Sequence, residues 1–490
     1  MILRLCYRAS IPFRSPCSVM NTRFFSIKIA VVGSGPAGFY TTQRLLKNQD
    51  IRVDIFEKLP VPFGLVRYGV APDHQEVKNV INSFTAVANH DRVNFYGNVS
   101  LGEAIKVDDL LEAYHAVVLC YGSAQDKLLN IDGELTTKNT ISARNFVGWY
   151  NGVPEDKDLE IDLNCDTACI IGQGNVALDC ARILSKPTNL EKTDITSYAQ
   201  QMIANSEIKK IYIIGRRGPI QVSFATKELR ELMHLNDSRI KIEPSTMFED
   251  YGLSLAQLKS LSRQRRRLVE LILNLHAVSK KNLDHSPECI LKFMSKPHKI
   301  VANRDTGWVE RLELQRTRYD NADEFINEKS VPIDTNEFEK IDCGLVIRSI
   351  GYKATMVDKS LPFDTKLGAI MNTRGRIHGY RSLYCSGWLA TGASGVIAGT
   401  LQSSQVTAQS ILEDIQNKQL PSLAVDKSGY ETIREIVKAK SIQVVHFNDW
   451  LQIDLLERRL GETMGKPREK FVDVDKMLDV AREKIKHDQK

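Results

Sequence analysis

Two glycine-rich turns in this sequence have the residue types and the spacing of phosphate-binding cradles. The first follows the apolar run 29–32 and carries Gly33, Gly35 and Gly38 in the pattern G-x-G-x-x-G, with Ala37 before the third glycine. In such a turn the first glycine permits the bend, the second lets the backbone approach a diphosphate, and the third lets the helix pack against the strand. Backbone N–H groups at the helix start then face the anion.

An acidic residue lies at the offset that a dinucleotide site requires. The next apolar run, 51–56, ends in Glu57, nineteen positions after Gly38. An acid roughly 20 residues after the turn accepts hydrogen bonds from a ribose hydroxyl. Because the turn and the acid are in register, a dinucleotide site is favoured over a purely structural turn.

The second cradle follows the apolar run 168–171 and has alanine in the third position. It reads Gly172, Gln173, Gly174, Asn175, Val176, Ala177. Alanine in that place still allows close packing of helix on strand.

The strand after the second cradle ends in basic residues and not in an acid. The apolar run 211–214 is followed by Gly215 and then by Arg216 and Arg217. Guanidinium groups offer forked donors to a phosphate, so the pair favours NADP(H) over NAD(H), the alternative being a solvated basic turn. The 39-residue spacing from Ala177 to Arg216 requires an insertion around 187–206.

Two further stretches have a structural and a functional interpretation. Residues 59–74 mix prolines and glycines with apolar residues, which predicts an extended loop with His74 at its end. This loop either simply connects two elements or packs against the flat ring of a ligand. Arg263, Arg266 and Arg267 share one face of a predicted helix. A solvated surface is the ordinary explanation for them, and docking of an acidic protein is the alternative hypothesis.

The cysteines indicate a reducing compartment and restrict the electron route. None of the nine forms a C-x-x-C pair. A flavoprotein of the dithiol-reductase type needs such a pair, so electrons must leave this chain by another route. The sequence also lacks H-E-x-x-H, P-loop and G-x-S-x-G motifs, and we predict no metal site.

The N-terminus has the composition of a mitochondrial transit peptide. It carries arginines at 4, 8, 14 and 23, and no acidic residue precedes Asp50. Removal of residues 1–25 would lower the net charge from +6 to +2, so we do not expect nucleic-acid binding driven by bulk charge. No apolar run approaches the roughly 18 residues that span a bilayer, which leaves a peripheral membrane contact open.

These motifs together resemble one family, the mitochondrial NADPH–adrenodoxin (ferredoxin) reductases. The resemblance spans nearly the whole chain after the presequence, and the pair Gly387-Trp388 is a sharp marker because related flavoproteins usually have Gly-Asp there. The matching stretches are 33–38, 59–74, 172–179, 215–219, 227–232, 387–388, 391–397 and 465–470.

The family implies an α/β fold with two Rossmann-like dinucleotide-binding domains, as in glutathione-reductase-like flavoproteins, the NADP domain being inserted into the FAD domain. The expected segments are the transit peptide 1–25, the FAD domain 26–124, the NADP domain 125–352, and 353–490 for the rest of the FAD domain and the tail.

The resemblance also implies which residues serve each function. FAD contacts are implied for Ala37, Glu57, Leu65, Leu101, Trp388, Gly395, Val396 and Ile397. NADP(H) contacts are implied for Gln173, Gly174, Asn175, Val176, Arg216, Arg217 and Glu228, with Gly395 touching both cofactors. His74 and Glu231 match polar residues near the nicotinamide, and Arg230, Arg263 and Arg267 match the basic residues that receive the ferredoxin.

The implied activity is transfer of electrons from NADPH through FAD to an acidic mitochondrial [2Fe–2S] ferredoxin, which serves cytochrome P450 or iron–sulfur and haem biosynthesis. We expect a monomer in the matrix, with a peripheral contact with the inner membrane left open. Two alternatives remain: a flavoprotein with another acceptor, like the small subunit of glutamate synthase, and a non-catalytic FAD/NADP redox sensor. The former typically carries cysteine clusters that are missing here.

Overall fold

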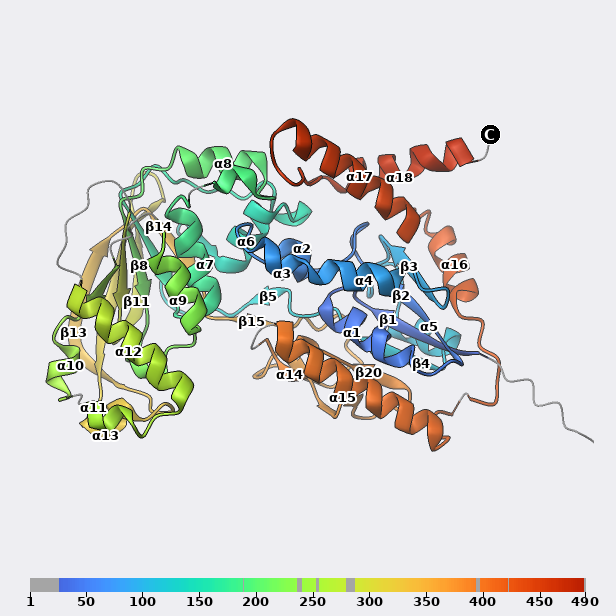
Figure 1. Ribbon diagram of the computed structural model, residues 1–490, viewed down its shortest axis with the longest axis horizontal. Coiled ribbons are helices and arrows are strands. Elements are labelled where there is room, and N and C mark those ends of the chain that lie inside the picture. The colour runs from blue at the N-terminus through green and yellow to red at the C-terminus, as the bar shows by residue number, and fades with distance from the viewer. Residues whose placement is uncertain are drawn as a thin grey trace, which may run out of the picture.

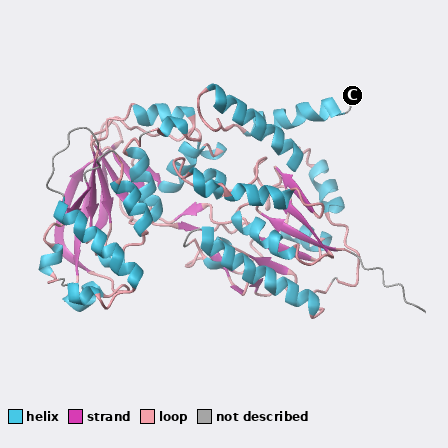
Figure 2. Cartoon of the chain, in the orientation of Figure 1, coloured by secondary structure: helices cyan, strands magenta, loops and turns pink. Residues whose placement is uncertain are grey.

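The computed structural model describes residues 26–488, except 188, 236–239, 253–254, 279–286, 394–396 and 422. Two sheets, one mostly and one wholly parallel, lie with their helices at opposite ends of the molecule (Figure 1). The two-residue strands β5 (Gln125–Asp126) and β15 (Tyr352–Lys353) pair where the chain passes between the sheets, as Figure 2 shows.

The first sheet is built from two distant parts of the chain. Its order is β18-β19-β20-β4-β1-β2-β3-β21, and the five strands from β20 to β3 are parallel. The early strands are β1 (Ile27–Val32), β2 (Ile51–Phe56), β3 (Val93–Gly97) and β4 (Ala116–Leu119). The late strands are β18 (Asn372–Thr373), β19 (Arg376–Ile377), β20 (Leu383–Cys385) and β21 (Val445–His446).

The second sheet is wholly parallel, in the order β6-β14-β7-β8-β10-β9. Its strands are β6 (Thr140–Ser142), β7 (Thr167–Ile171), β8 (Lys210–Ile214), β9 (Ile240–Glu243), β10 (Glu288–Lys292) and β14 (Leu345–Arg348). One face packs on an antiparallel sheet of β11 (Ser295–Ala302), β12 (Val309–Arg318) and β13 (Ile333–Asp342).

Side chains alternate along the strands, so each sheet has a core on both faces. In β1, Ile29 and Val31 pack into one buried cluster and Ala30 and Val32 into the other. This double burial accounts for the unbroken apolar runs of the sequence, because a parallel strand covered on both faces has no solvent side.

Helices surround both sheets. Near the first sheet lie α1 (Pro36–Leu45), α2 (Leu65–Tyr68), α3 (Gln75–Lys78), α4 (Val80–Ala88), α5 (Val107–Ala113), α14 (Trp388–Thr391), α15 (Ile397–Gln416) and α16 (Tyr430–Ala439). Near the second lie α6 (Ala143–Asn151), α7 (Asn175–Leu184), α8 (Ser197–Ala204), α9 (Thr226–Met233), α10 (Met247–Asp250), α11 (Leu255–Leu258), α12 (Arg263–Val278) and α13 (Ala322–Ile326). The tail forms α17 (Phe447–Thr463) and α18 (Val474–Asp488).

Several local expectations can be compared with these elements. The predicted arginine-bearing helix is α12, and the expected insertion before β8 contains α8. The stretch 59–74 is not wholly extended, because Gly64 with φ +48° turns the chain into the single helical turn α2. The described cysteines are free thiols. Every helix in the described part is too short or too polar to cross a bilayer.

Candidate functional site

The first cradle has the geometry expected from its three glycines. Gly33 has φ +106°, and a Cβ there would lie 2.6 Å from the carbonyl oxygen of Cys120. A Cβ at Gly38 would lie 2.0 Å from the carbonyl oxygen of Gly33, so α1 can pack against β1 only without a side chain. By contrast, nothing lies within 4 Å of a Cβ placed on Gly35. The space above Gly35 is therefore open, as a diphosphate would require.

Glu57 follows β2 beside this cradle. Its Oε2 accepts hydrogen bonds from the backbone N–H of Ser34 (2.9 Å) and from the Ser34 hydroxyl (2.8 Å), and its Oε1 accepts one from Leu59 N–H (3.2 Å). These bonds hold the carboxylate against the turn. The structure thus brings together the two features that lie nineteen residues apart in the sequence.

The C-terminal part of the chain returns to the first cradle at Gly387. This residue has φ +66°, and a Cβ there would lie 2.5 Å from the Cβ of Ala37. Trp388 begins α14 directly afterwards, and its ring lies 6.0 Å from that of Tyr352. Its indole Nε1 is buried and has no hydrogen-bond partner among the described residues. A buried donor without an acceptor indicates a site for a polar group that is not part of the chain.

The structure describes some, but not all, of the remaining residues expected at the first cradle. Leu65 is 42% exposed and starts α2, next to Gly64, whose added Cβ would lie 3.0 Å from Gly35 Cα. Leu101 bridges to Ile105 and packs at the edge of the first sheet's core. Gly395 and Val396 lie outside the described residues. Ile397 is the first residue of α15.

The second cradle repeats the geometry of the first. Gly172 has φ +129°, and its added Cβ would lie 2.1 Å from the carbonyl oxygen of Ser349, whereas Gly174 has open space around it. The Gln173 amide donates to the carbonyls of Ile213 (3.2 Å) and Lys292 (3.1 Å).

The side chain of Asn175 also supports the cradle. Its Oδ1 accepts a hydrogen bond from Ala225 N–H (2.8 Å), and Val176 packs against the core. Since the Gln173 side chain is bonded to strands β8 and β10 and that of Asn175 to the residue before α9, the backbone at the start of α7 is the part of this cradle left to face a ligand.

Arg216 and Arg217 lie beyond the end of β8. Arg216 is exposed, Arg217 is half-buried, and within the described ranges no carboxylate lies within 4 Å of either side chain. Burial lowers the pKa of Arg217, and the neighbouring charges of Arg216 and Arg265 lower it further, against an opposing effect of Tyr319. Unpaired, mutually repelling cations of this kind fit a phosphate group.

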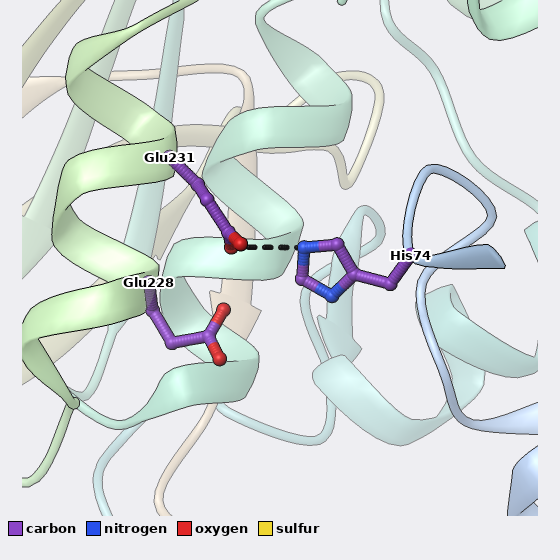
Figure 3. Close-up of side chains that lie close together, drawn as sticks. All are labelled: His74, Glu228 and Glu231. Atoms are coloured by element: carbon purple, nitrogen blue, oxygen red, sulfur yellow. Dashed lines mark ion pairs between the residues drawn. The ribbon is translucent and has the colours of Figure 1, made fainter. Parts of the chain in front are cut away.

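His74, Glu228 and Glu231 form a compact group (Figure 3). His74 precedes α3, whereas both glutamates project from α9. His74 Nε2 lies 2.9 Å from Glu231 Oε2, and the His74 side chain is only 12% exposed. Burial, together with the charges of Asp179 and Glu231, raises the pKa of Glu228 to about 7.

The same three residues each offer an atom within 4.8 Å of the others, a spacing that a metal ion could bridge. The sequence predicts no metal here. The Arg182 guanidinium already supplies positive charge, since its Nη1 lies 3.9 Å from a carboxylate oxygen of both Glu228 and Glu231.

Arg182 is the residue of this site that the sequence did not indicate. It is 2% exposed, with Nε 2.5 Å from Asp73 and Nη2 2.7 Å from Asp179. Burial opposes its charge, but Asp179 and Asp73 outweigh that effect and raise the pKa of Arg182. The available signal was Asp179-x-x-Arg182 on the helix after the second cradle, a charged pair on a face that must be buried.

Three ion pairs join the loop after α2 to helices of the second sheet. Besides Asp73 with Arg182 and His74 with Glu231, Glu76 lies 3.3 Å from Lys227. Charged side chains therefore connect the segment after α2 to α7 and α9.

The basic residues expected to bind a partner share one surface. Arg230 on α9 and Arg263 and Arg267 on α12 are exposed, and these two helices pack side by side (Figure 1). In the part of the chain that the structure describes, no carboxylate lies within 4 Å of these three side chains, whereas Arg266 pairs with Glu270 at 3.8 Å. We call Arg230, Arg263 and Arg267 the basic surface.

Comparisons with known proteins agree on the family. Residues 27–254 match the model of the pyridine nucleotide-disulphide oxidoreductases. The chain is 46% identical to "NADPH:adrenodoxin oxidoreductase, mitochondrial" of Homo sapiens, over 94% of this chain and 93% of that one. It is 39% identical to the Arabidopsis thaliana protein of the same name, over 94% and 98%.

A solved structure, Mycobacterium tuberculosis FprA in complex with NADPH, is 33% identical to this chain with a TM-score of 0.83, over 93% of this chain and 99% of that one. The expected pair of Rossmann-like units is thus found in the sheets and in a solved relative. The chain belongs to the family of mitochondrial NADPH:adrenodoxin oxidoreductases.

Proposed function

We propose that this protein passes electrons from NADPH, through bound FAD, to a mitochondrial [2Fe–2S] ferredoxin of the adrenodoxin type. One observation carries the proposal. The two glycine-rich turns have similar backbone geometry, but the residues after the strand that follows each turn have opposite charges. Glu57 lies there for the first cradle, and the unpaired Arg216 and Arg217 lie there for the second. A carboxylate suits a ribose and a pair of guanidiniums suits a 2′-phosphate, so each cradle has its own cofactor.

FAD belongs in the first cradle. Gly33, Gly35 and Gly38 would receive its diphosphate and Glu57 its ribose. For the remaining contacts with FAD we propose Ala37, Leu65, Leu101, Trp388, Gly395, Val396 and Ile397. The open space at Gly35 and the unsatisfied indole N–H of Trp388 support this assignment.

NADP(H) belongs in the second cradle. Backbone groups of Gln173, Gly174, Asn175 and Val176 would face its diphosphate, and Arg216 and Arg217 its 2′-phosphate. Glu228 would hold a ribose hydroxyl, and Gly395 would lie near both cofactors. The braced side chains of Gln173 and Asn175 support this, because they keep the cradle rigid.

Bound FAD accepts a hydride and can return electrons singly, which suits a two-electron donor and a one-electron acceptor. His74 and Glu231 are the proposed catalytic residues. Their 2.9 Å contact lets a proton be held at His74 Nε2 or at the Glu231 carboxylate. Arg182 fixes the loop that carries His74, and the partial burial of His74 and Glu231 limits the access of water to these groups.

The basic surface is the proposed docking site for the ferredoxin. Unpaired arginines on α9 and α12 would attract an acidic partner and accelerate its encounter. We further propose a mature monomer in the mitochondrial matrix that lacks residues 1–25, with domains of 26–124 plus 353–490 and of 125–352. The transit-peptide composition and the β5–β15 pairing support these limits. Salt washing of mitochondrial membranes tests a peripheral contact with the inner membrane.

The deciding experiment uses the purified mature chain. We expect a yellow protein whose flavin absorbance bleaches with NADPH and far more slowly with NADH. It should reduce cytochrome c only when a mitochondrial ferredoxin is added. Equal cytochrome reduction without ferredoxin would favour an enzyme with another acceptor, and bleaching without any turnover would favour a redox sensor.

A further inference from the structure

A polar cavity of about 150 Å³ is lined by residues outside both glycine-rich turns. Its walls come from α2 and the loop before it, from α3 and α4, from α17, from the tail segment after α17, and from Asp194 in the insertion before β8. None of the residues assigned above to FAD, NADP(H) or the ferredoxin lines it. The lining side chains that carry a positive charge are Arg67, Lys78, Arg458, Arg468 and Lys470.

These five cations share only three carboxylates. Asp194 accepts both Lys78 (2.6 Å) and Lys470 (3.0 Å). Asp454, on α17, pairs with Arg458 (2.8 Å) and Arg468 (2.6 Å). Glu457 pairs with Arg67 (2.5 Å) and Arg468 (3.2 Å). Two positive charges in the wall are therefore not compensated by these carboxylates.

Part of the excess charge is buried: Arg67, Lys78 and Lys470 are three buried cations with two buried carboxylates, whereas Arg458 is 56% exposed. Side-chain exposure is 0% for Lys470, 3% for Arg67 and 8% for Lys78. Arg67 Nε is buried and lacks a hydrogen-bond partner within the described part of the chain. Burial lowers the pKa of Lys470 to about 7, and Lys78 and Arg67 contribute to this against the opposing charge of Asp194. Such an arrangement costs free energy unless an anion offsets it.

We propose that this cavity is a binding site for a small tetrahedral oxyanion of the phosphate class. A phosphate ion with a few waters fits a cavity of this volume, since one water occupies about 30 Å³ of liquid. The amides of Asn79 and Asn82 on the walls supply further donors. The bound ion would join α3, the insertion and the tail, three segments that are far apart in the sequence.

The site borders the loop that carries His74. Gln75 follows His74 directly and donates to the carbonyl of Pro72 (2.7 Å) and to Asp194 (2.9 Å), so the cavity wall and the His74 loop are one hydrogen-bonded unit. Occupancy would therefore stabilise the junction between the sheets without touching either cofactor.

The test is calorimetric titration of the FAD-loaded full chain with inorganic phosphate. NADP⁺ is present in saturating amount, so that Arg216 and Arg217 are occupied, and sodium chloride keeps the ionic strength constant. We expect saturable binding of one phosphate per chain and a matching rise in the thermal midpoint. Sulfate should compete, because it has the same shape, and acetate should not.

Exposed wall residues provide variants that leave the fold intact. Arg458→Gln removes a wall cation and Asn82→Asp adds a wall carboxylate; each should weaken phosphate binding about tenfold, in keeping with a charged hydrogen bond. The matched controls Arg459→Gln and Ser83→Asp change exposed neighbours that do not line the cavity, and should bind as the wild type does.

Asp454→Asn removes a competing carboxylate and should tighten binding. The absence of a saturable signal, or equal affinities in wall and control variants, would overturn the proposal. None of these readouts depends on electron transfer, so the result stands apart from the activity proposed above.

Discussion

The guanidinium of Arg182, on a helix of the second sheet, lies 2.5 Å from the carboxylate of Asp73, on the loop that leads to His74. The same guanidinium contacts Asp179 at 2.7 Å and approaches Glu228 and Glu231 at 3.9 Å. One buried cation thus sets the position of the proposed catalytic histidine relative to the helix that carries its partner.

Replacement of Arg182 should impair hydride transfer more than FAD binding. Arg182→Met leaves Asp73 and Asp179 without their cation, and breaking a buried pair in this way costs about 3 kcal/mol. We expect at least a tenfold slower bleaching of the flavin by NADPH in stopped-flow measurements, with normal flavin content. Arg434→Met, which alters an exposed helical arginine, serves as the control. Wild-type bleaching rates in Arg182→Met would contradict this role.

Two glycines of the first cradle should respond differently to alanine. At Gly35 a Cβ meets nothing within 4 Å, so Gly35→Ala should fold normally and lose FAD affinity, because the methyl group occupies the diphosphate space. At Gly38 the Cβ would lie 2.0 Å from a carbonyl oxygen, so Gly38→Ala should lose about 2 kcal/mol or more of folding stability. Flavin content and the thermal midpoint of the apoprotein distinguish the two. Normal flavin retention by Gly35→Ala would refute the cradle assignment.

The preference for NADPH over NADH should depend on the arginine pair. Arg216→Gln and Arg217→Gln each remove a charged donor, and we expect KM for NADPH to rise about 10- to 100-fold with little change for NADH. Steady-state ferredoxin-dependent reduction of cytochrome c with both nucleotides measures this. Arg304→Gln changes an exposed arginine elsewhere and should leave the preference intact. Parallel losses for both nucleotides would show that the pair acts on the fold and not on the 2′-phosphate.

The raised pKa of Glu228, about 7 against an ordinary 4.5, predicts a pH-dependent stability difference. The folded state holds this proton more tightly than the unfolded state, so Glu228 stabilises the fold at low pH and loses that contribution between pH 4.5 and 7. The Glu228→Gln side chain cannot ionise, so the free energy of unfolding of this variant should rise relative to that of the wild type as the pH increases across this range. The rise should be on the order of 1 kcal/mol after allowance for solvent screening. Thermal midpoints at pH 5, 6, 7 and 8 test this. Glu249 is exposed, so the difference in midpoint between Glu249→Gln and the wild type should not change with pH, and this variant is the control. A constant difference would contradict the raised pKa.

Charge reversal on the basic surface should weaken the partner's binding and its salt dependence. For the double variant Arg263→Glu/Arg267→Glu we expect KM for ferredoxin to rise at least about tenfold at low salt, and to converge with the wild type at high salt. Bleaching by NADPH alone should be unchanged. The double variant Arg304→Glu/Lys366→Glu changes the net charge equally at other exposed positions and is the matched control. Equal effects of both pairs would exclude a local docking site.

The local parts of the fold and site could be predicted from the sequence. A glycine's backbone conformation and its close contacts depend on a few neighbouring residues, which is why the turns at Gly33 and Gly172 match expectation. The insertion between the second cradle and Arg216 could also be predicted, because the distance from the turn to the end of the next strand is longer than in the usual dinucleotide motif. The turn α2 was not, because proline and glycine content indicates an irregular loop without showing where it coils.

Long-range charge pairing could not be predicted. Arg182 and Asp73 are 109 residues apart, and Lys470 and Asp194 are 276 residues apart. Nothing in the composition of either segment identifies its partner, because the sequence does not distinguish a buried arginine or lysine from an exposed one. His74 and Glu231 were identified through family resemblance, and only the folded chain shows that they touch.

The first sheet is discontinuous in the chain, and this has a consequence for biogenesis. Strand β4 requires β20, more than 260 residues later, whereas every strand of the second sheet lies between residues 140 and 348. The second sheet can therefore form while the first still lacks a central neighbour, since domains fold as units once their strands are available. Flavin uptake becomes a late event in maturation, and the C-terminal third of the chain determines when the protein acquires its colour.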